Sequence, residues 1–506
     1  MAQLRPRLLE CHRPALRIAA FAAAGVLAGC ATVPQESPSA LPFAVPPAWS
    51  GDASAAPKDT TADATSLAQW WQRFDDPLLS RLVDEALSAN TNVTSAEAAV
   101  RQARALRDVA AAALLPVVSG SVSAQRSSAG GKSLGNSFRA GLDASWELDI
   151  FGENRAGLNA SEATLGATAA TLGNVQVSVA AEVAANYITL RGTEARLAIA
   201  KDNLETQLET LQITEWRVQA GLATSLDAEQ ARAGTEQTRA LLPALNTAIV
   251  QTRHALAVLT GKPPAALTAE LAASGPIPKA PDTLALSFPA ETLRQRPDVR
   301  AAEFQVSSAM ARVTQADAAR YPSFRIGGAL GLASLTLGAL TSGSSVLSSL
   351  LANMTLPIFE GGALLAQVRA QQAELDQAHS AYQATVLTAL RDVEDALVAL
   401  QGDRDRLLHL QLAAESAGNA SLLARQRYSS GLVDFQTVLD TQRTQLTTQE
   451  GVANATTDLG NDYVRLYKAL GGGWTPDGLN AATAASNPTS TPTQNRATSA
   501  SSAKTS

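Results

Sequence analysis

Four stretches of the chain alternate between apolar and polar residues in the way that predicts β-strands. In the clearest stretch, residues 138–150, even-numbered positions carry Phe, Ala, Leu, Trp and Ile, and odd-numbered positions carry Arg, Gly, Asp, Ser and Glu. The same period of two runs through residues 118–124, 324–332 and 346–358, the last with a more mixed polar face. This period places successive side chains on opposite faces of a strand. We therefore expect two pairs of strands of about 10–14 residues, long enough for a tilted strand to cross a bilayer.

Alternation of this kind has two interpretations, and the number of strands bears on the choice. A soluble sheet with one buried face produces the same pattern. In a bilayer, by contrast, a sheet must close on itself, because an open edge would leave backbone groups without hydrogen bonds in lipid. Four strands are too few to close a barrel, so a membrane sheet requires several chains. Three copies would supply twelve strands, which lies within the known range of such barrels.

Two long segments predict helices of unusual length. Residues 153–218 and 360–430 contain no proline, and about 66 helical residues make a rod of roughly 100 Å. Two shorter helices, at about residues 78–114 and 224–260, would together match one rod in length. In the second rod, apolar residues recur every seven positions, as in a coiled coil. The two series are Val368, Leu375, Tyr382, Ala389 and Ala396, and Val386, Val393, Leu400 and Leu407. Rods this long indicate a tube wall or stalk rather than a compact globule.

Short motifs recur in the same order at nearly constant spacings of 206 to 210 residues, which indicates an internal duplication. The matching pairs are Leu115-Pro116 with Tyr321-Pro322, Ile150-Phe151 with Ile358-Phe359, Arg217 with Arg427, and Ala220-Gly221-Leu222 with Ser430-Gly431-Leu432. We expect one structural unit used twice, at residues 66–270 and 271–474. Each unit would contain a helical segment, a pair of strands, a long helix, a glycine-containing turn and a second helix.

The composition supports an extended helical protein. Of the residues, 46% are apolar but only 4% are aromatic and 17% charged, whereas a compact enzyme of this length usually has more of both. About 100 residues are alanine, which favours helices that pack closely. The net charge of −6 argues against a nucleic-acid partner, which would require a clustered basic surface. Beyond the N-terminus, no run of about 18 apolar residues predicts a membrane-spanning helix.

The N-terminus resembles a bacterial lipoprotein leader. Residues 1–29 have an arginine-rich start and a short apolar core, as signal peptides do. The following Leu27-Ala28-Gly29-Cys30 resembles the lipobox, which implies cleavage before Cys30 and a covalent lipid on its thiol. Ala31 after the cysteine favours the outer membrane. Residues 30–65 then form a lipidated tether and residues 475–506 a disordered tail, because both are rich in small polar residues and lack an apolar period.

Candidate catalytic motifs do not hold up. Gly131-Lys132-Ser133-Leu134-Gly135 formally fits G-x-S-x-G, but it lies between two alternating strands instead of in a strand-to-helix turn. His254, His379 and His409 are far apart in the sequence, whereas a metal site needs clustered ligands. We therefore predict that the protein is not an enzyme and binds no metal or cofactor apart from the lipid on Cys30.

Taken together and in order, several motifs resemble those of the TolC-like outer-membrane efflux factors, and specifically of their NodT-type lipoprotein branch. The resemblance spans residues 66–474. The motifs are Trp70-Trp71, Phe74-Asp75-Asp76-Pro77-Leu78, Ser145-Trp146-Glu147-Leu148-Asp149-Ile150-Phe151-Gly152, Leu226-Asp227, Arg296-Pro297-Asp298-Val299-Arg300, Leu356-Pro357-Ile358-Phe359-Glu360-Gly361-Gly362, Arg427-Tyr428 and Leu439-Asp440.

The resemblance implies a mainly α-helical fold with a membrane β-barrel. Each chain of a homotrimer would give four strands to one 12-stranded barrel and its helices to a coiled-coil tunnel, or α-helical barrel, in the periplasm. The trimer would be lipid-anchored in the outer membrane as the passive exit duct of a tripartite efflux pump. Its partners would be a periplasmic membrane-fusion adaptor and an inner-membrane transporter, most typically of the RND type. The cargo would be drugs, toxic solutes or metals.

The resemblance also implies two groups of site residues. The turns at the periplasmic tip would contact the adaptor, and near them charged residues would close the tunnel, with pairs formed within or between subunits. The turn residues are Ala220, Gly221, Leu222, Ser430, Gly431 and Leu432, and the gate residues are Arg427, Gln436 and Asp440. Two other functions stay open at this point. One is the outer-membrane duct of a type I protein or peptide secretion system, and the other is a non-conducting periplasmic coiled-coil scaffold.

Overall fold

The computed structural model describes residues 43–47, 49, 67–127, 135–279 and 295–475. All the elements below belong to one unit, Val45–Ser506. The predicted leader with Cys30, most of the tether, most of the G-x-S-x-G loop and nearly all of the tail lie outside the described residues. The boundary between the two predicted repeats at residue 270 stays a prediction.

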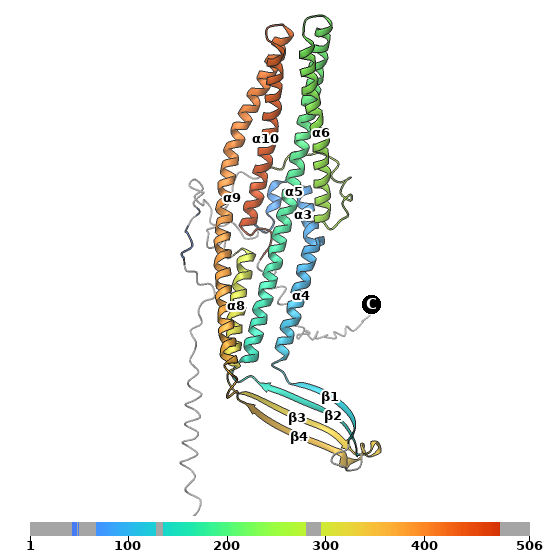
Figure 1. The fold of residues 1–506 in the computed structure, drawn as a ribbon, viewed down its shortest axis with the longest axis vertical. Helices are drawn as coiled ribbons and strands as arrows, with labels where there is room; N and C mark the ends of the chain where they lie inside the picture. The colour runs from blue at the N-terminus through green and yellow to red at the C-terminus, as the bar shows by residue number, and fades with distance from the viewer. Residues whose placement is uncertain (1–42, 48, 50–66, 128–134, 280–294, 476–506) are drawn as a thin grey trace, which may run out of the picture. The chain divides into compact units, whose positions relative to one another are not determined.

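The alternating stretches form one antiparallel sheet of four strands in the order β1-β2-β3-β4 (Figure 1). The strands are β1 (Val117–Ser127), β2 (Gly135–Leu148), β3 (Ser323–Ser334) and β4 (Val346–Thr355). The central pair joins the two halves of the chain, and β1 and β4 form the two edges. The prediction of two strand pairs is thus confirmed, and the pairs are continuous with each other.

The predicted alternation runs too far at the end of each strand pair. Ile150 and Ile358 continue the period of two, yet β2 ends at Leu148 and β4 at Thr355. After β2, the Ile150 backbone N–H turns back to the Leu148 carbonyl at 2.8 Å, which ends the extended chain. After β4 comes Pro357, which has no N–H to donate to a ladder.

The two rods are confirmed, and their lengths are equal. The long helices α5 (Glu153–Gln219) and α9 (Ala363–Ser429) have 67 residues each, and the shorter α6 (Ser225–Leu259) and α10 (Phe435–Ala469) have 35 each. Corresponding helices begin and end 210 residues apart. Most residues of the predicted heptad series on α9 are buried, namely Val368, Tyr382, Val386, Ala389, Val393, Ala396 and Leu400.

The predicted helix at 78–114 is wrong in one respect, because it is two helices. α3 (Pro77–Ala89) ends before Asn90, and α4 (Thr91–Ala112) begins after it. The Asn90 side chain accepts a hydrogen bond from the Asn92 N–H at 2.8 Å and so caps α4. The same side chain donates to the Leu259 carbonyl at the end of α6, also at 2.8 Å. A tertiary contact therefore fixes the break.

The helices pack along α5. This helix contacts α4, α6, α10 and α8 (Pro297–Ala318), while α9 packs against α8 and α10. The largest buried side chains gather where the N-terminal 3₁₀ helix (Trp70–Phe74) meets α5 and α10. There Trp70 stacks on Tyr467 with ring centroids 5.1 Å apart. Away from this aromatic cluster, much of the core is alanine and valine, which lets the helices approach closely.

None of the helices in the described part of the chain combines the length and the hydropathy of a membrane-spanning helix.

Candidate functional site

The turn between α5 and α6 is built by a glycine with positive φ. Gly221 has φ 70°, a left-handed conformation in which a Cβ would be strained. Its N–H donates to the Val218 carbonyl at 3.0 Å, and the next N–H, of Leu222, donates to the Arg217 carbonyl at 2.7 Å. This pair of bonds is a Schellman motif, which satisfies the last carbonyls of the helix. Thr224 then caps α6, so the turn is short and rigid.

The turn between α9 and α10 repeats this geometry. Gly431 has φ 73° and donates to the Tyr428 carbonyl at 3.0 Å, and Leu432 donates to the Arg427 carbonyl at 2.9 Å. Asp434 takes the place of Thr224 as the cap of the following helix. Hydrogen bonds from the Thr437 side chain and backbone lower the pKa of Asp434 below its usual value. The cap therefore stays ionised to an unusually low pH.

Both turns present an apolar side chain to solvent. Leu222 is 71% exposed and Leu432 is 74% exposed. The small residues beside them, Ala220 and Ser430, are also exposed. A rigid turn with an exposed leucine offers a preorganised apolar contact to a partner, because little conformational entropy is lost when it binds. The six residues predicted as partner contacts are thus placed in two equivalent, accessible turns.

A contact between the two hairpins lies just behind these turns, and the sequence analysis did not assign it. The Arg217 guanidinium of α5 donates to the Tyr428 carbonyl of α9 at 2.8 Å. It also lies over the Tyr428 ring, 4.4 Å from the centroid. Tyr428 in turn packs on Phe435 of α10, with ring centroids 5.5 Å apart. The available signal was the repeat of Arg217 and Arg427 at a spacing of 210, but spacing alone does not say what an arginine contacts.

The predicted gate residues are only partly brought together. The Gln436 side chain donates to Asp440 at 3.0 Å, and both residues are exposed on α10. Asp440 lies 3.9 Å from Arg443, one turn further along the same helix, and this is the ion pair it makes in the described chain. Arg427 is exposed near the end of α9. A pair between Arg427 and Asp440 of different subunits stays a prediction.

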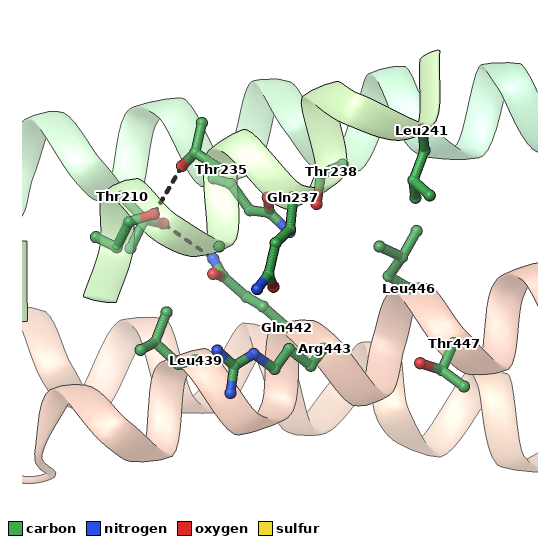
Figure 2. Close-up of a pocket in the computed structure, with 13 residues that line it drawn as sticks. Thr210, Thr235, Gln237, Thr238, Leu241, Leu439, Gln442, Arg443, Leu446 and Thr447 are labelled. Atoms are coloured by element: carbon green, nitrogen blue, oxygen red, sulfur yellow. Dashed lines mark hydrogen bonds between the residues drawn. The ribbon is translucent and has the colours of Figure 1, made fainter. Parts of the chain in front are cut away.

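A polar cleft separates the two hairpins further from the turns (Figure 2). Its volume is about 230 Å³. The walls come from α5, α6 and α10, and Thr235, Thr238 and Gln237 face Gln442 and Arg443 across it. Gln442 donates to the Thr210 hydroxyl at 2.9 Å, which ties α10 to α5 beside the cleft. The hairpins are therefore joined here by uncharged polar groups and small side chains rather than by tight apolar packing.

Metal and catalytic chemistry find no support in the described parts of the chain. No group of three or more His, Cys, Asp or Glu residues there could hold a metal ion. His254 lies on α6, and His379 and His409 lie on α9, 30 residues apart. The turns and the contact behind them can bind a partner and can hold the hairpins together.

Comparison with known proteins gives consistent matches over most of the chain. A family model described as outer membrane efflux protein matches residues 82–262 and 288–472. The chain is 31% identical over 459 residues to the solvent efflux pump outer membrane protein SrpC of Pseudomonas putida, a match that covers 89% of the chain and 96% of that relative. It is 28% identical over 456 residues to nodulation protein T of Rhizobium leguminosarum bv. trifolii, with the same coverages.

A solved structure agrees in fold. The structure of the outer-membrane channel OprN superposes on this chain with a TM-score of 0.80 at 33% sequence identity, and the match covers 87% of this chain and 100% of that one. The likeness therefore extends through the sheet, the long helices and both turns.

Proposed function

Because the chain belongs to the outer membrane efflux protein family and is the outer-membrane channel component of an efflux pump, we propose that three copies assemble into one passive exit duct. The sheets of the three copies form a single 12-stranded barrel in the outer membrane, and their helices form a tunnel that extends into the periplasm. The duct catalyses no reaction. Energy for transport comes from its partners.

The observation that carries the trimer is the sheet. In one chain it ends in two edge strands, β1 and β4, and its apolar side chains on both faces are exposed. Exposed apolar side chains on even-numbered positions are Val118, Val122, Leu142, Trp146, Ile326, Leu330, Val346, Leu350 and Met354. An apolar band is what lipid requires, and the two edges become paired only when several copies close a ring.

The partners follow from the role in a pump. A periplasmic membrane-fusion adaptor contacts the exposed turns at Leu222 and Leu432, and through it an inner-membrane transporter of the RND type supplies cargo. Two equivalent turns in each chain give six contact points in a trimer, which suits a ring of adaptor subunits. Arg427, Gln436 and Asp440, just behind the second turn, control the opening at that end. The lipid on Cys30 anchors each chain to the outer membrane.

The cargo is a small molecule that is toxic inside the cell. SrpC, to which the chain is similar, is named as part of a solvent efflux pump. The described part of the chain contains no charged pocket dedicated to one ligand, which fits a duct whose selectivity is set upstream. Lumen-facing carboxylates would favour cations over anions.

Reconstitution tests the duct directly. The purified protein in a planar bilayer should give discrete single-channel conductance, and deletion of its gene should raise accumulation of toxic solutes in a strain without redundant channels. A protein that never conducts, from a gene whose deletion changes no efflux, would instead be a scaffold. Export of a peptide or protein, with unchanged accumulation of small solutes, would favour a type I secretion duct.

The adaptor contact has its own test. Leu222→Asp combined with Leu432→Asp should abolish complementation of the efflux defect, because two charges would replace the apolar contacts of the turns. Leu335→Asp is the matched control, since Leu335 is equally exposed but lies next to β3. Single-channel conductance should stay normal in the double variant. Full complementation by the double variant would exclude the turns as adaptor contacts.

A further inference from the structure

The packing of α10 on α5 is a template for a contact between copies of the chain. The hairpin of α5 and α6 corresponds to that of α9 and α10 residue by residue at a spacing of 210, since both the long and the short helices have equal lengths. Within one chain, α10 packs extensively on both α9 and α5, whereas its counterpart α6 packs extensively on α5 alone. The face of α6 that corresponds to the second contact of α10 is therefore left without an equivalent partner.

Two glycines make the template contact close. A Cβ added to Gly192 of α5 would lie 2.0 Å from the Thr457 hydroxyl of α10, so only glycine leaves room for this threonine. One turn away, a Cβ on Gly460 of α10 would lie 3.0 Å from Ile188, whose side chain is completely buried. The contact thus consists of a threonine in a glycine notch and, next to it, an apolar pair.

The counterparts of these four residues repeat the notch and the apolar pair on surfaces that are exposed in one chain. Gly402 of α9 corresponds to Gly192, and a Cβ there would meet nothing within 4 Å. Thr247 of α6 corresponds to Thr457 and is exposed. Val398 and Val250 correspond to Ile188 and Gly460, and they are 62% and 46% exposed. One helix therefore carries the notch and the other carries the threonine that fits it.

We propose that α9 of one copy docks on α6 of the next copy, with Thr247 filling the notch at Gly402 and Val250 packing on Val398. This inference rests on the proposed trimer and specifies its helical interface. The contact joins two different surfaces, so it repeats head to tail and closes a ring when the rotation between copies is one third of a turn. The occupant of the α9 face is a second copy of this chain, because the residues that fit the face lie on α6 at the spacing that the duplication requires.

Cysteine cross-linking tests the pairing. The full-length Val250→Cys/Val398→Cys double variant, oxidised in membranes, should form covalent dimers and trimers on non-reducing gels. Val250→Cys alone and Val398→Cys alone should stay monomeric on the same gels, which controls for any other thiol. A double variant that remains monomeric on the gel, although native mass spectrometry shows a trimer, would overturn the proposed interface while leaving the trimer intact. Wild-type protein that is monomeric by native mass would instead overturn the trimer itself.

Filling the notch is the complementary test. Gly402→Leu should lose most of the trimer on native gels, because a leucine would occupy the space for Thr247 of the next copy. The single chain should still fold, since leucine is the better helix former and nothing lies within 4 Å of the added Cβ. Gly418→Leu is the matched control on the same helix: its Cβ also meets nothing, and its counterpart Leu208 on α5 is exposed. A stable Gly402→Leu trimer would contradict the proposal.

Discussion

Arg217 is the residue that ties the two hairpin ends together within one chain. It combines a hydrogen bond to the Tyr428 carbonyl with a position over the Tyr428 ring. Because Tyr428 also packs on Phe435 of α10, the arginine links one hairpin to both helices of the other. Neither a lysine nor a shorter side chain would make both contacts, since the planar guanidinium stacks and donates at once.

Removal of this link should loosen the closed end of the channel. Arg217→Ala should weaken the contact between the hairpins by about 1–2 kcal/mol, and the channel should then open more often in bilayer recordings. Uptake of large antibiotics should rise in cells. Arg232→Ala is the control, because Arg232 is paired with Glu215 and Glu229 on the exposed surface of the same hairpin. Equal open probability in both variants would show that Arg217 does not hold the hairpins together.

Asp462 is a fully buried carboxyl at the contact of α9 and α10, and it makes the stability of this contact depend on pH. Burial, followed by hydrogen bonding to Asp403, raises its pKa to about 6, while Arg465 opposes the shift. Between pH 4 and pH 6 the folded state therefore binds more protons than the unfolded state. The free energy of unfolding consequently falls as the pH rises through this window.

Asp462→Asn should remove this dependence. At pH 7 the variant should have a higher melting temperature than the wild type, because an amide needs no ionisation in the buried site. At pH 4 the two should be nearly equal, since the wild-type carboxyl is then largely protonated. Thermal unfolding followed by circular dichroism at both pH values measures the difference. Asp458→Asn, an exposed position on the same helix, should shift little; a wild-type advantage for Asp462 at pH 7 would contradict the assignment.

At the scale of elements, the sequence predicts the long helices well and the break between α3 and α4 poorly. The long helices follow from the absence of proline and from the heptad series on α9, both of which are local properties. The residues around Asn90 are compatible with one continuous helix, and the break is fixed by the bond from its side chain to the Leu259 carbonyl. A contact across 169 residues leaves no periodic signal in the sequence.

This argument makes Asn90 an element-scale prediction. Asn90→Ala removes the cap of α4 and leaves the Leu259 carbonyl without its donor, so the free energy of unfolding should fall by about 2–3 kcal/mol. Thermal unfolding of the detergent-extracted protein measures the loss. Ser88→Ala, which removes a bond to a backbone carbonyl on the exposed side of α3, should change the midpoint far less. Equal shifts would mean that Asn90 does not act as the junction.

The turns show the same division between local and tertiary signals. Gly221 and Gly431 could be found from the sequence because a left-handed turn requires glycine and because the duplication places it twice. The contact between Arg217 and Tyr428 could not, because it joins helices 211 residues apart. Arg427 and Asp440 match in sequence position but do not meet in the chain, so position within a hairpin did not predict their partners.

At the scale of the whole molecule, the duplication also bears on how the sheet closes. The helices before the sheet, α4 and α8, correspond at a spacing of 206 residues, and the helices after it at 210. The loop between β3 and β4 is four residues longer than the loop between β1 and β2, which accounts for the difference. The strand registers agree, since Val117 pairs with Ser145 and Ser323 with Thr355. β2 and β4 thus correspond at 210, two residues more than the repeated Ile-Phe pair suggests.

This correspondence predicts the register between β4 of one copy and β1 of the next. Ser145 pairs with Gly327 and Ala144 with Gly328 where β2 meets β3, so Thr355 should lie opposite Ser121 of the next copy, and Met354 opposite Val122. Neighbouring pairs of an antiparallel ladder alternate between close and wide spacing, so at least one of the variants Thr355→Cys/Ser121→Cys and Met354→Cys/Val122→Cys should cross-link efficiently into covalent trimers. The Ile-Phe spacing would instead place Ser119 opposite Thr355. Stronger cross-linking of Thr355→Cys/Ser119→Cys would therefore show that the strands, unlike the helices, follow that spacing.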